Sequence, residues 1–289
     1  MSTTRTPSIL AVFTLLAFGS ITARAAATGY DAIYVFGDSY CDVGNIYAAT
    51  SHAIPAAPYF NGRFSNGPIW VDHIASAWGL PMAPSLLGGT DYAFGGAFVT
   101  SDQITPEGTI PSVPHQVALY LSQHGGHADP KALYIIEGGG NDILGASNVT
   151  PQYLGYQIAL GLSESELLLR RAGAVHFLIP DLLDVGLLPA ATNPSFASAA
   201  TVATNSSLNV FLGFEELLEG IYIHRIDVFK LFHAIAADST HFGFVNITDP
   251  CLDPTVCADP DHTLFWDTEH PTEFGHAFFA VTVEAALGQ

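Results

Sequence analysis

Three side chains spread along this sequence of 289 residues could act together as a nucleophile, a base and an acid that orients the base. Ser39 follows the apolar run Ile33–Phe36, which predicts a buried strand, and the Gly-Asp pair before it predicts a sharp turn that presents the hydroxyl. Asp267 and His270 stand three residues apart, a spacing at which a carboxylate can reach an imidazole and fix its tautomer. These residue types predict attack of a serine on an ester carbonyl, through an acyl-enzyme.

The oxyanion formed in such an attack needs hydrogen-bond donors that are already in place. The sequence offers three of them: the backbone N–H of Ser39, the backbone N–H of Gly96 and the side-chain amide of Asn141. Gly96 and Asn141 follow the predicted strands 91–94 and 132–137. Because the carboxyl ends of parallel strands meet at one edge of a sheet, we expect these donors to gather beside Ser39.

The stretches that carry these residues resemble the four sequence blocks of the GDSL, or SGNH, hydrolases. In chain order they are Phe36-Gly37-Asp38-Ser39, Tyr92-Ala93-Phe94-Gly95-Gly96-Ala97, Gly139-Gly140-Asn141-Asp142 and Asp267-x-x-His270-Pro271. Smaller matches at 61–70, 180–182 and 265–267 resemble the branch that contains plant GDSL lipases and bacterial secreted esterases, phospholipases and haemolysin-like enzymes. The chain departs from the family pattern at Tyr40, where the family often has Leu, and at Asp91, where it usually has Asn.

The resemblance implies a flavodoxin-like, three-layer α/β/α fold and a role for each candidate residue. By this resemblance the catalytic residues are Ser39, Asp267 and His270, and the oxyanion hole is formed by Ser39, Gly96 and Asn141. Family spacing favours Gly96 over the neighbouring Gly95 as the backbone donor. No cofactor and no metal ion is expected for this reaction.

Hydrophobic patterning predicts an α/β fold in which strands and helices alternate. The five predicted strands are 33–36, 91–94, 132–137, 174–179 and 222–226, and helices are predicted to begin near Pro68, Pro114, Tyr153, Phe196, Val228 and Pro271. Such alternation predicts a mostly parallel, five-stranded sheet with helices on both faces. The sequence has neither an internal repeat nor a linker, so residues 27–289 are predicted to form one domain, which we expect to be a monomer.

Residues 1–25 have the pattern of a secretory signal peptide. Arg5 gives a positive start, Ile9–Phe18 is an apolar segment too short to span a bilayer comfortably, and Ala23-Arg24-Ala25 offers a cleavage site. An uncleaved anchor is the alternative. No other apolar run approaches membrane-spanning length, so the mature chain is expected to be secreted and to have no integral membrane segment.

The chain is strongly acidic, with 27 Asp and Glu residues against 8 Lys and Arg residues and a net charge of −19 at pH 7. The electrostatic field of so negative a net charge repels nucleic acid and anionic lipid surfaces, and it therefore disfavours them as partners. It says little about a neutral small-molecule or lipid ester, which is the substrate we expect.

Two of the three cysteines are predicted to form a disulfide. Cys251 and Cys257 are six residues apart in a loop and would be oxidised outside the cell. Cys41 has no evident partner, and we expect it to be a small buried residue.

The sequence leaves two functional classes open. The first is a secreted serine ester hydrolase, for which a carboxylic ester with an apolar acyl chain leads and phospholipid acyl chains or acetylated polysaccharides are the rivals. The second is a binding module that keeps the fold with a dead site. Such a module is expected to have lost a catalytic residue, whereas this chain retains Ser39, Asp267 and His270.

Overall fold

The computed structural model describes residues 29–217 and 220–288, so the predicted signal peptide at 1–25 lies outside the described residues. The central sheet has four parallel strands in the order β1-β4-β5-β6, which are Ile33–Phe36, Leu133–Ile136, His176–Pro180 and Tyr222–Ile226. β4 is buried at every position, as expected for a central strand with helices on both faces of its sheet. The predicted α/β fold with a mainly parallel sheet is confirmed.

One of the five predicted strands, 91–94, is not a regular strand. It lies beside β1, where Asp91 makes one isolated bridge to Val35 and the N–H of Tyr92 donates to the Val35 carbonyl oxygen at 2.7 Å. The carboxylate of Asp91 accepts the N–H of Ala93 at 2.9 Å. This local turn competes with a strand ladder, so the sheet has four strands rather than five.

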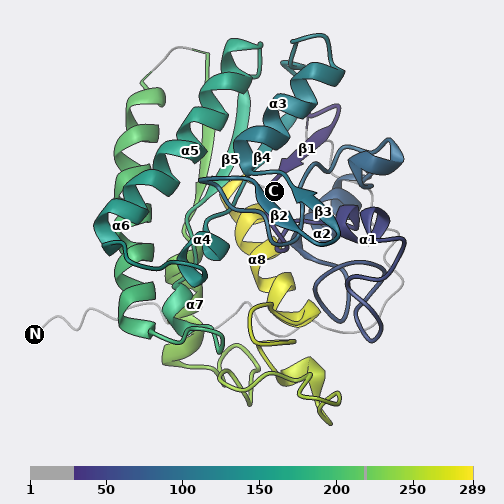
Figure 1. Ribbon diagram of the computed structural model, residues 1–289, viewed down its shortest axis with the longest axis vertical. Coiled ribbons are helices and arrows are strands. Elements are labelled where there is room, and N and C mark those ends of the chain that lie inside the picture. The colour runs from purple at the N-terminus through teal and green to yellow at the C-terminus, as the bar shows by residue number, and fades with distance from the viewer. Residues whose placement is uncertain (1–28, 218–219, 289) are drawn as a thin grey trace, which may run out of the picture.

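Helices cover both faces of the sheet (Figure 1). On one face lie α3 (Val113–Gln123), α5 (Pro151–Arg171) and α6 (Pro194–Glu215), and on the other lie α2 (Trp70–Trp78), α7 (Val228–Ala237) and α8 (Glu273–Ala286). α2 and α8 are joined by the stacked rings of Trp70 and Phe279, whose centroids are 4.4 Å apart. The molecule therefore has three layers, helices on either side of the sheet.

α8 begins at Glu273 and not at Pro271 as predicted. The hydroxyl of Thr272 accepts the N–H of Gly275 at 3.3 Å, which makes Thr272 the N-cap. Pro271 thus lies in the loop that carries Asp267 and His270, directly before the helix.

The remaining elements lie in the connections between these strands and helices. They are α1 (Asn45–Ala49), α4 (Gly140–Leu144), β2 (Gln103–Thr105), β3 (Gly108–Ile110) and the 3₁₀ turns η1 (Ser85–Leu87), η2 (Val185–Leu187) and η3 (Pro260–His262). β2 and β3 form an antiparallel hairpin, which the sequence patterns do not predict. Among the described residues, no helix is both long and apolar enough to cross a membrane.

The predicted disulfide between Cys251 and Cys257 is present. It closes a short loop that leads towards Asp267 and His270, since the N–H groups of Cys251 and Leu252 donate to the carbonyl oxygens of Phe265 and Trp266. Cys41 is a free thiol and is fully buried, as expected.

Candidate active site

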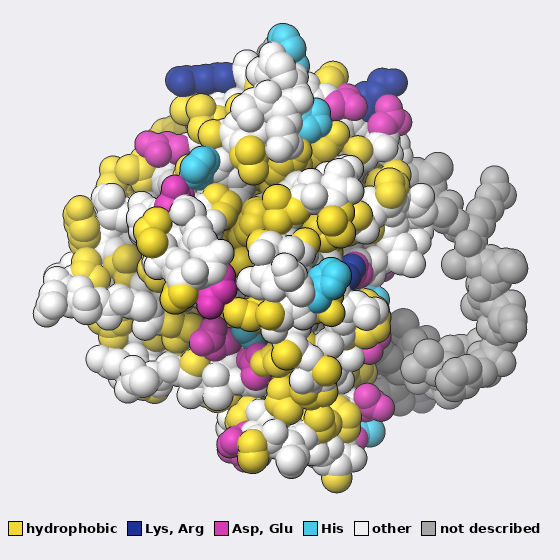
Figure 2. All heavy atoms as spheres, turned by 45° about the vertical axis from the view of Figure 1, so that its right-hand side comes forward, with side chains coloured by type: hydrophobic (Ala, Val, Ile, Leu, Met, Phe, Trp, Pro, Cys, Tyr) yellow, Lys and Arg dark blue, Asp and Glu magenta, His cyan; other side chains and the backbone are white. Residues whose placement is uncertain are grey.

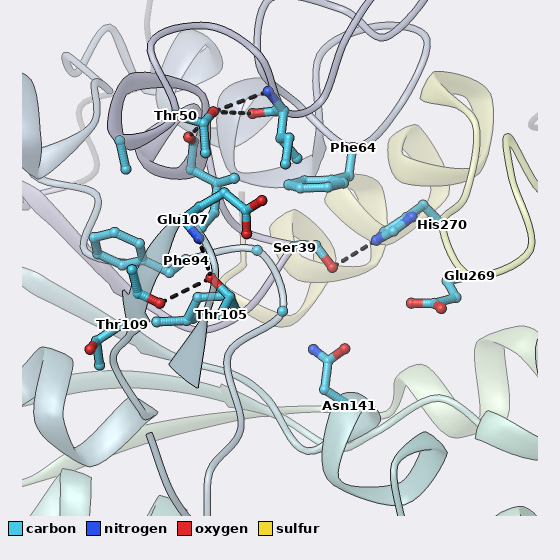
Figure 3. Close-up of a pocket in the computed structure, with 17 residues that line it drawn as sticks. Ser39, Thr50, Phe64, Phe94, Thr105, Glu107, Thr109, Asn141, Glu269 and His270 are labelled. Atoms are coloured by element: carbon cyan, nitrogen blue, oxygen red, sulfur yellow. Dashed lines mark hydrogen bonds between the residues drawn. The ribbon is translucent and has the colours of Figure 1, made fainter. Parts of the chain in front are cut away.

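Ser39, His270 and Asp267 form a continuous line of hydrogen bonds at the carboxyl edge of the sheet. His270 Nε2 lies 2.7 Å from Ser39 Oγ (Figure 3). On the other side of the ring, His270 Nδ1 lies 2.7 Å from Asp267 Oδ2. The exposed fractions of Ser39 and His270 are only 5% and 7%, so the contact is shielded from solvent. Residues 231 positions apart in the chain thus meet as a hydroxyl, an imidazole and a carboxylate.

Asp267 is fixed by more than its histidine. Its Oδ1 accepts the backbone N–H groups of Glu269 and His270, both at 2.8 Å, and its Oδ2 accepts the hydroxyl of Tyr59 at 2.7 Å. Tyr59 is 208 residues away in the sequence, and no local pattern marks it as part of the site. Together these donors fix the carboxylate within hydrogen-bond distance of the imidazole.

The electrostatics of the pair favour its charged form. Burial alone would raise the pKa of Asp267, but the charge and hydrogen bond of His270 and the N–H of Glu269 bring this pKa down to about 2. Burial alone would lower the pKa of His270, but the charge and hydrogen bond of Asp267, with the charges of Glu269 and Asp38, outweigh it and raise this pKa. His270 is therefore a stronger base than a free histidine.

Two backbone N–H groups beside Ser39 are available as donors. Within the described part of the chain, the N–H groups of Ser39 and Gly96 have no hydrogen-bond acceptor. The N–H of Gly95 is already bonded to Asp42 Oδ2 at 2.8 Å, which favours Gly96 over Gly95 as the backbone donor. Gly96 has a φ of +79°, a left-handed conformation in which a side chain would be strained.

Asn141, in the first turn of α4, completes the group of predicted donors. Both Ser39 and Asn141 line the same pocket, and their side chains face one another across it in Figure 3. The amide Nδ2 donates to the Ala97 carbonyl oxygen at 3.1 Å and to Asp38 Oδ2 at 3.3 Å. Donation to an oxyanion therefore requires one of these N–H groups to be shared between its present acceptor and the oxyanion.

Aspartates near the blocks hold the turns together by accepting backbone N–H groups. Asp42 accepts the N–H groups of Gly44 and Gly95, and Asp142 accepts the N–H of Val99 at 2.8 Å. Asp91, which stands where the family usually has Asn, accepts the Val43 N–H at 2.7 Å in addition to its local turn. Asp91 therefore accepts backbone hydrogen bonds in these turns although the family usually has Asn at this position.

A largely apolar pocket of about 310 Å³ opens beside Ser39. One wall is formed by α1 and the segments that follow it, and the opposite wall by the β2–β3 hairpin. The apolar side chains that line it are Ile46, Ala49, Ile54, Phe64, Phe94 and Ile110. Among the lining residues the only carboxylates are Glu107 and Glu269, and there is no lysine or arginine.

No group of three or more histidine, cysteine, aspartate or glutamate side chains in the described residues could hold a metal ion. A parallel sheet that carries a bonded serine, histidine and aspartate at its carboxyl edge, next to an apolar pocket, is the arrangement of an α/β ester hydrolase.

Comparison with known proteins gives this class a family. Residues 33–283 match the family model of the GDSL-like lipase/acylhydrolases, and the chain belongs to this family. It is 27% identical to the thermolabile hemolysin of Vibrio parahaemolyticus over 86% of this chain and 62% of the relative, and 28% identical to an Arabidopsis thaliana GDSL esterase/lipase over 94% and 92%. It is also 34% identical to lipase 1 of Photorhabdus luminescens, over 59% of this chain but only 25% of that longer relative.

A solved structure shows the same fold. A member of the lipolytic G-D-S-L family from Veillonella parvula superposes with a TM-score of 0.51 at 15% identity, over 88% of this chain and 96% of that one. The relatives named here are esterases, lipases and a hemolysin, and the chain spans less than two thirds of the length of two of them, the hemolysin and lipase 1.

Proposed function

We propose that the protein is a secreted serine hydrolase that cleaves carboxylic esters with apolar acyl chains through an acyl-enzyme. The observation that carries this proposal is the line Ser39–His270–Asp267 at the mouth of the apolar pocket. Each group has the geometry its role requires: a nucleophile 2.7 Å from its base, and a base 2.7 Å from the acid that orients it.

The reaction follows from these contacts. His270 Nε2 takes the proton of Ser39 Oγ as the oxygen attacks the carbonyl carbon, and the N–H groups of Ser39 and Gly96 with the amide of Asn141 stabilise the oxyanion. The imidazolium then protonates the departing alcohol as the C–O bond breaks. Water, deprotonated by the same imidazole, attacks the acyl-enzyme and releases the acid and Ser39.

The pocket favours a longer acyl group over acetate. An acetyl group would fill only a small part of about 310 Å³, whereas each further buried methylene gains about 0.8 kcal/mol. Glu107 and Glu269 are carboxylates in the pocket lining, and on the face shown in Figure 2 acidic side chains outnumber basic ones. This charge disfavours an anionic alcohol portion, and we therefore place neutral esters first.

Phospholipid acyl hydrolysis is the second candidate. It is favoured by the similarity to the thermolabile hemolysin and by 25% identity to the phosphatidylcholine-sterol acyltransferase of Aeromonas hydrophila, over 82% of this chain and 70% of that relative. Against it stands the repulsion that Glu269, beside His270, would exert on a phosphate next to the ester bond.

Secretion is supported by the disulfide between Cys251 and Cys257, because such bonds persist in oxidising compartments. N-terminal sequencing of the protein from the culture medium tests it: a start just after Ala25 is expected, and retention of Met1 would contradict cleavage.

A serine-directed fluorophosphonate tests the mechanism. It should label Ser39 alone, as read by peptide mass spectrometry, and Ser39→Ala should abolish both labelling and hydrolysis of p-nitrophenyl butyrate. Ser65, which is buried and bonded to the Pro271 carbonyl oxygen at 2.9 Å, provides the control, since Ser65→Ala should leave labelling intact. A wild-type protein that is neither labelled nor active would indicate the binding module instead.

A further inference from the structure

Two carboxyl groups meet behind the Ser39 turn. Asp38 follows β1 and Glu137 follows β4, and these adjacent strands are paired up to Phe36 and Ile136. The two side chains line the same small cavity and interact directly, and the exposed fraction of Asp38 is only 2%. Among the described residues, no lysine or arginine forms an ion pair with either carboxyl group.

Two touching carboxyl groups without a cation cannot both be ionised at neutral pH, so the pair holds one proton. Asp38 accepts the N–H of Tyr40 at 3.0 Å and the amide of Asn141 at 3.3 Å, bonds that suit a carboxylate. Burial raises the pKa of Asp38 to about 6, whereas burial and the charge of Asp38 raise the pKa of Glu137 well above its ordinary value. The proton therefore belongs to Glu137, which donates it towards Asp38.

We propose that protonated Glu137 is a positioning residue for the oxyanion hole, acting through Asp38 on the amide of Asn141. The proposal rests on the proposed function, because it assumes that Asn141 faces the oxyanion formed on Ser39. Glu137 keeps the Asp38 carboxylate in place, and this carboxylate holds the Asn141 amide within reach of the reacting carbonyl.

Burial and the charge of Asp38 raise the pKa of Glu137, and the hydrogen bonds from the Asp38 N–H and the Cys41 thiol, which favour its charged form, do not outweigh them. From the turn after β1 the glutamate is faced by Tyr40 and by the thiol of Cys41, whose Sγ lies 3.6 Å from Glu137 Oε2. Asp181, after β5, lines the same small cavity of about 30 Å³ as the pair, and Asp142 of α4 adds its charge near Asp38. His270 is the group that can place a positive charge near Asp38, and it is neutral at the pH at which it acts as a base.

Loss of the Glu137 proton therefore has a catalytic consequence. The two carboxylates would repel one another, Asp38 would leave Asn141, and the amide would lose its fixed position. The turnover of the wild-type enzyme should accordingly fall on the alkaline side of its optimum, in addition to the fall on the acidic side that protonation of His270 causes.

Glu137→Gln tests this inference, because glutamine has the same shape and keeps an N–H donor for Asp38 but cannot ionise. We expect kcat at pH 7 within about twofold of wild type and no alkaline fall up to pH 10, with hydrolysis of ethyl butyrate followed by pH-stat. Glu137→Leu removes the donor and should lower kcat by about 10²-fold with KM nearly unchanged. Thermal melting of both variants separates a loss of folding from a loss of positioning.

Two controls isolate the carboxyl pair. Glu166 of α5 is a fully buried glutamate, with a pKa that burial raises to about 7, but it contacts Arg170 far from Ser39 in the fold. Glu166→Gln should keep the alkaline fall of the wild type. Cys41→Ala removes the only thiol that faces Glu137 and should keep it too.

The outcomes are distinct. An alkaline fall that persists in Glu137→Gln, or a folded Glu137→Leu with normal kcat, would overturn the positioning role while leaving Ser39 labelled by fluorophosphonate. A wild-type enzyme without any alkaline fall would also overturn it. Absence of labelling and turnover in the wild type would instead refute the proposed function itself.

Discussion

Replacing Asp267 by asparagine should stop catalysis while keeping the fold, and the structure indicates why. The Oδ1 position accepts the N–H groups of Glu269 and His270 at 2.8 Å, so the amide oxygen of the new side chain would stay there. The amide nitrogen would then take the Oδ2 position, facing His270 Nδ1. An N–H donor at that place, on the shorter of the two contacts to Nδ1, favours Nδ1 as the acceptor and puts the imidazole proton on Nε2, where it points at Ser39.

The imidazole in that tautomer cannot accept the serine proton. We expect kcat to fall by about 10⁴-fold, which corresponds to about 5.5 kcal/mol of transition-state stabilisation. The acid limb of the pH profile should also move to lower pH. Activity requires neutral His270, and the charge of Asp267 is the largest influence that raises its pKa, so without it burial dominates and the pKa falls.

Stability gives an independent readout of the same pair. The pKa of Asp267 is lowered from 3.8 to about 2, so the pair contributes about 2 kcal/mol above pH 3.8, and this is lost as the pH falls through 2. The pKa of His270 is raised, so its share is present below pH 6.5 and is lost as the pH rises through the folded-state value. Wild type should therefore exceed Asp267→Asn in urea unfolding most clearly between pH 3.8 and 6.5.

A matched control lies eight residues upstream. Asp259 and His262 have the same spacing and are 2.7 Å apart, but both side chains are about half exposed and no serine faces them. Asp259→Asn should leave kcat unchanged with p-nitrophenyl butyrate between pH 5 and 9. If Asp267→Asn retained kcat within tenfold of wild type, another group would have to orient His270 and the tautomer argument would be wrong.

Three further predictions concern the residues around this pair. Asn141→Ala should lower kcat by about 10²–10³-fold with KM nearly unchanged and Tm within a few degrees, whereas early melting at normal turnover would make Asn141 a turn residue only. Tyr59→Phe keeps the ring against Trp266 but removes one donor to Asp267, so kcat should fall by about tenfold, and an unchanged kcat would show the hydroxyl to be dispensable. Ala49→Trp adds an indole to the pocket wall formed by α1 and should lower kcat/KM for an octanoyl ester by up to about 10²-fold while sparing the butyryl ester, since four methylenes lose about 3 kcal/mol of burial; equal losses on both esters would place the acyl chain elsewhere.

The sequence predicted the elements whose local pattern is strong. β1 and β6 have the predicted ends, and α7 spans Val228–Ala237 as predicted, because apolar periodicity and Asp227 at its N-cap mark it clearly. The β2–β3 hairpin was missed because each strand has three residues and Ile104 is 82% exposed, so neither shows a buried alternation. This matters for function, since the hairpin forms a wall of the acyl pocket.

The roles of the residues that support the site could not be predicted from local sequence patterns, for a different reason. Tyr59 and Glu137 act on Asp267 and Asp38 through contacts that span 208 and 99 positions of the chain. No composition or spacing near either residue distinguishes it from a packed tyrosine or a strand-end glutamate. Such roles depend on which strand ends become neighbours, which the order of strands in the sheet decides.

The two Asp-x-x-His pairs separate what sequence spacing determines from what the tertiary fold determines. Asp259 with His262 and Asp267 with His270 make the same hydrogen bond at the same distance, so the spacing alone produces the pair in both places. Only the second pair is buried, and only there does the other imidazole nitrogen meet a hydroxyl. Burial strengthens the influence of the carboxylate on the imidazole, and the Ser39 turn supplies the proton to be moved. A histidine three residues after an aspartate therefore becomes a candidate base only where the fold also places a nucleophile within hydrogen-bond distance of its imidazole.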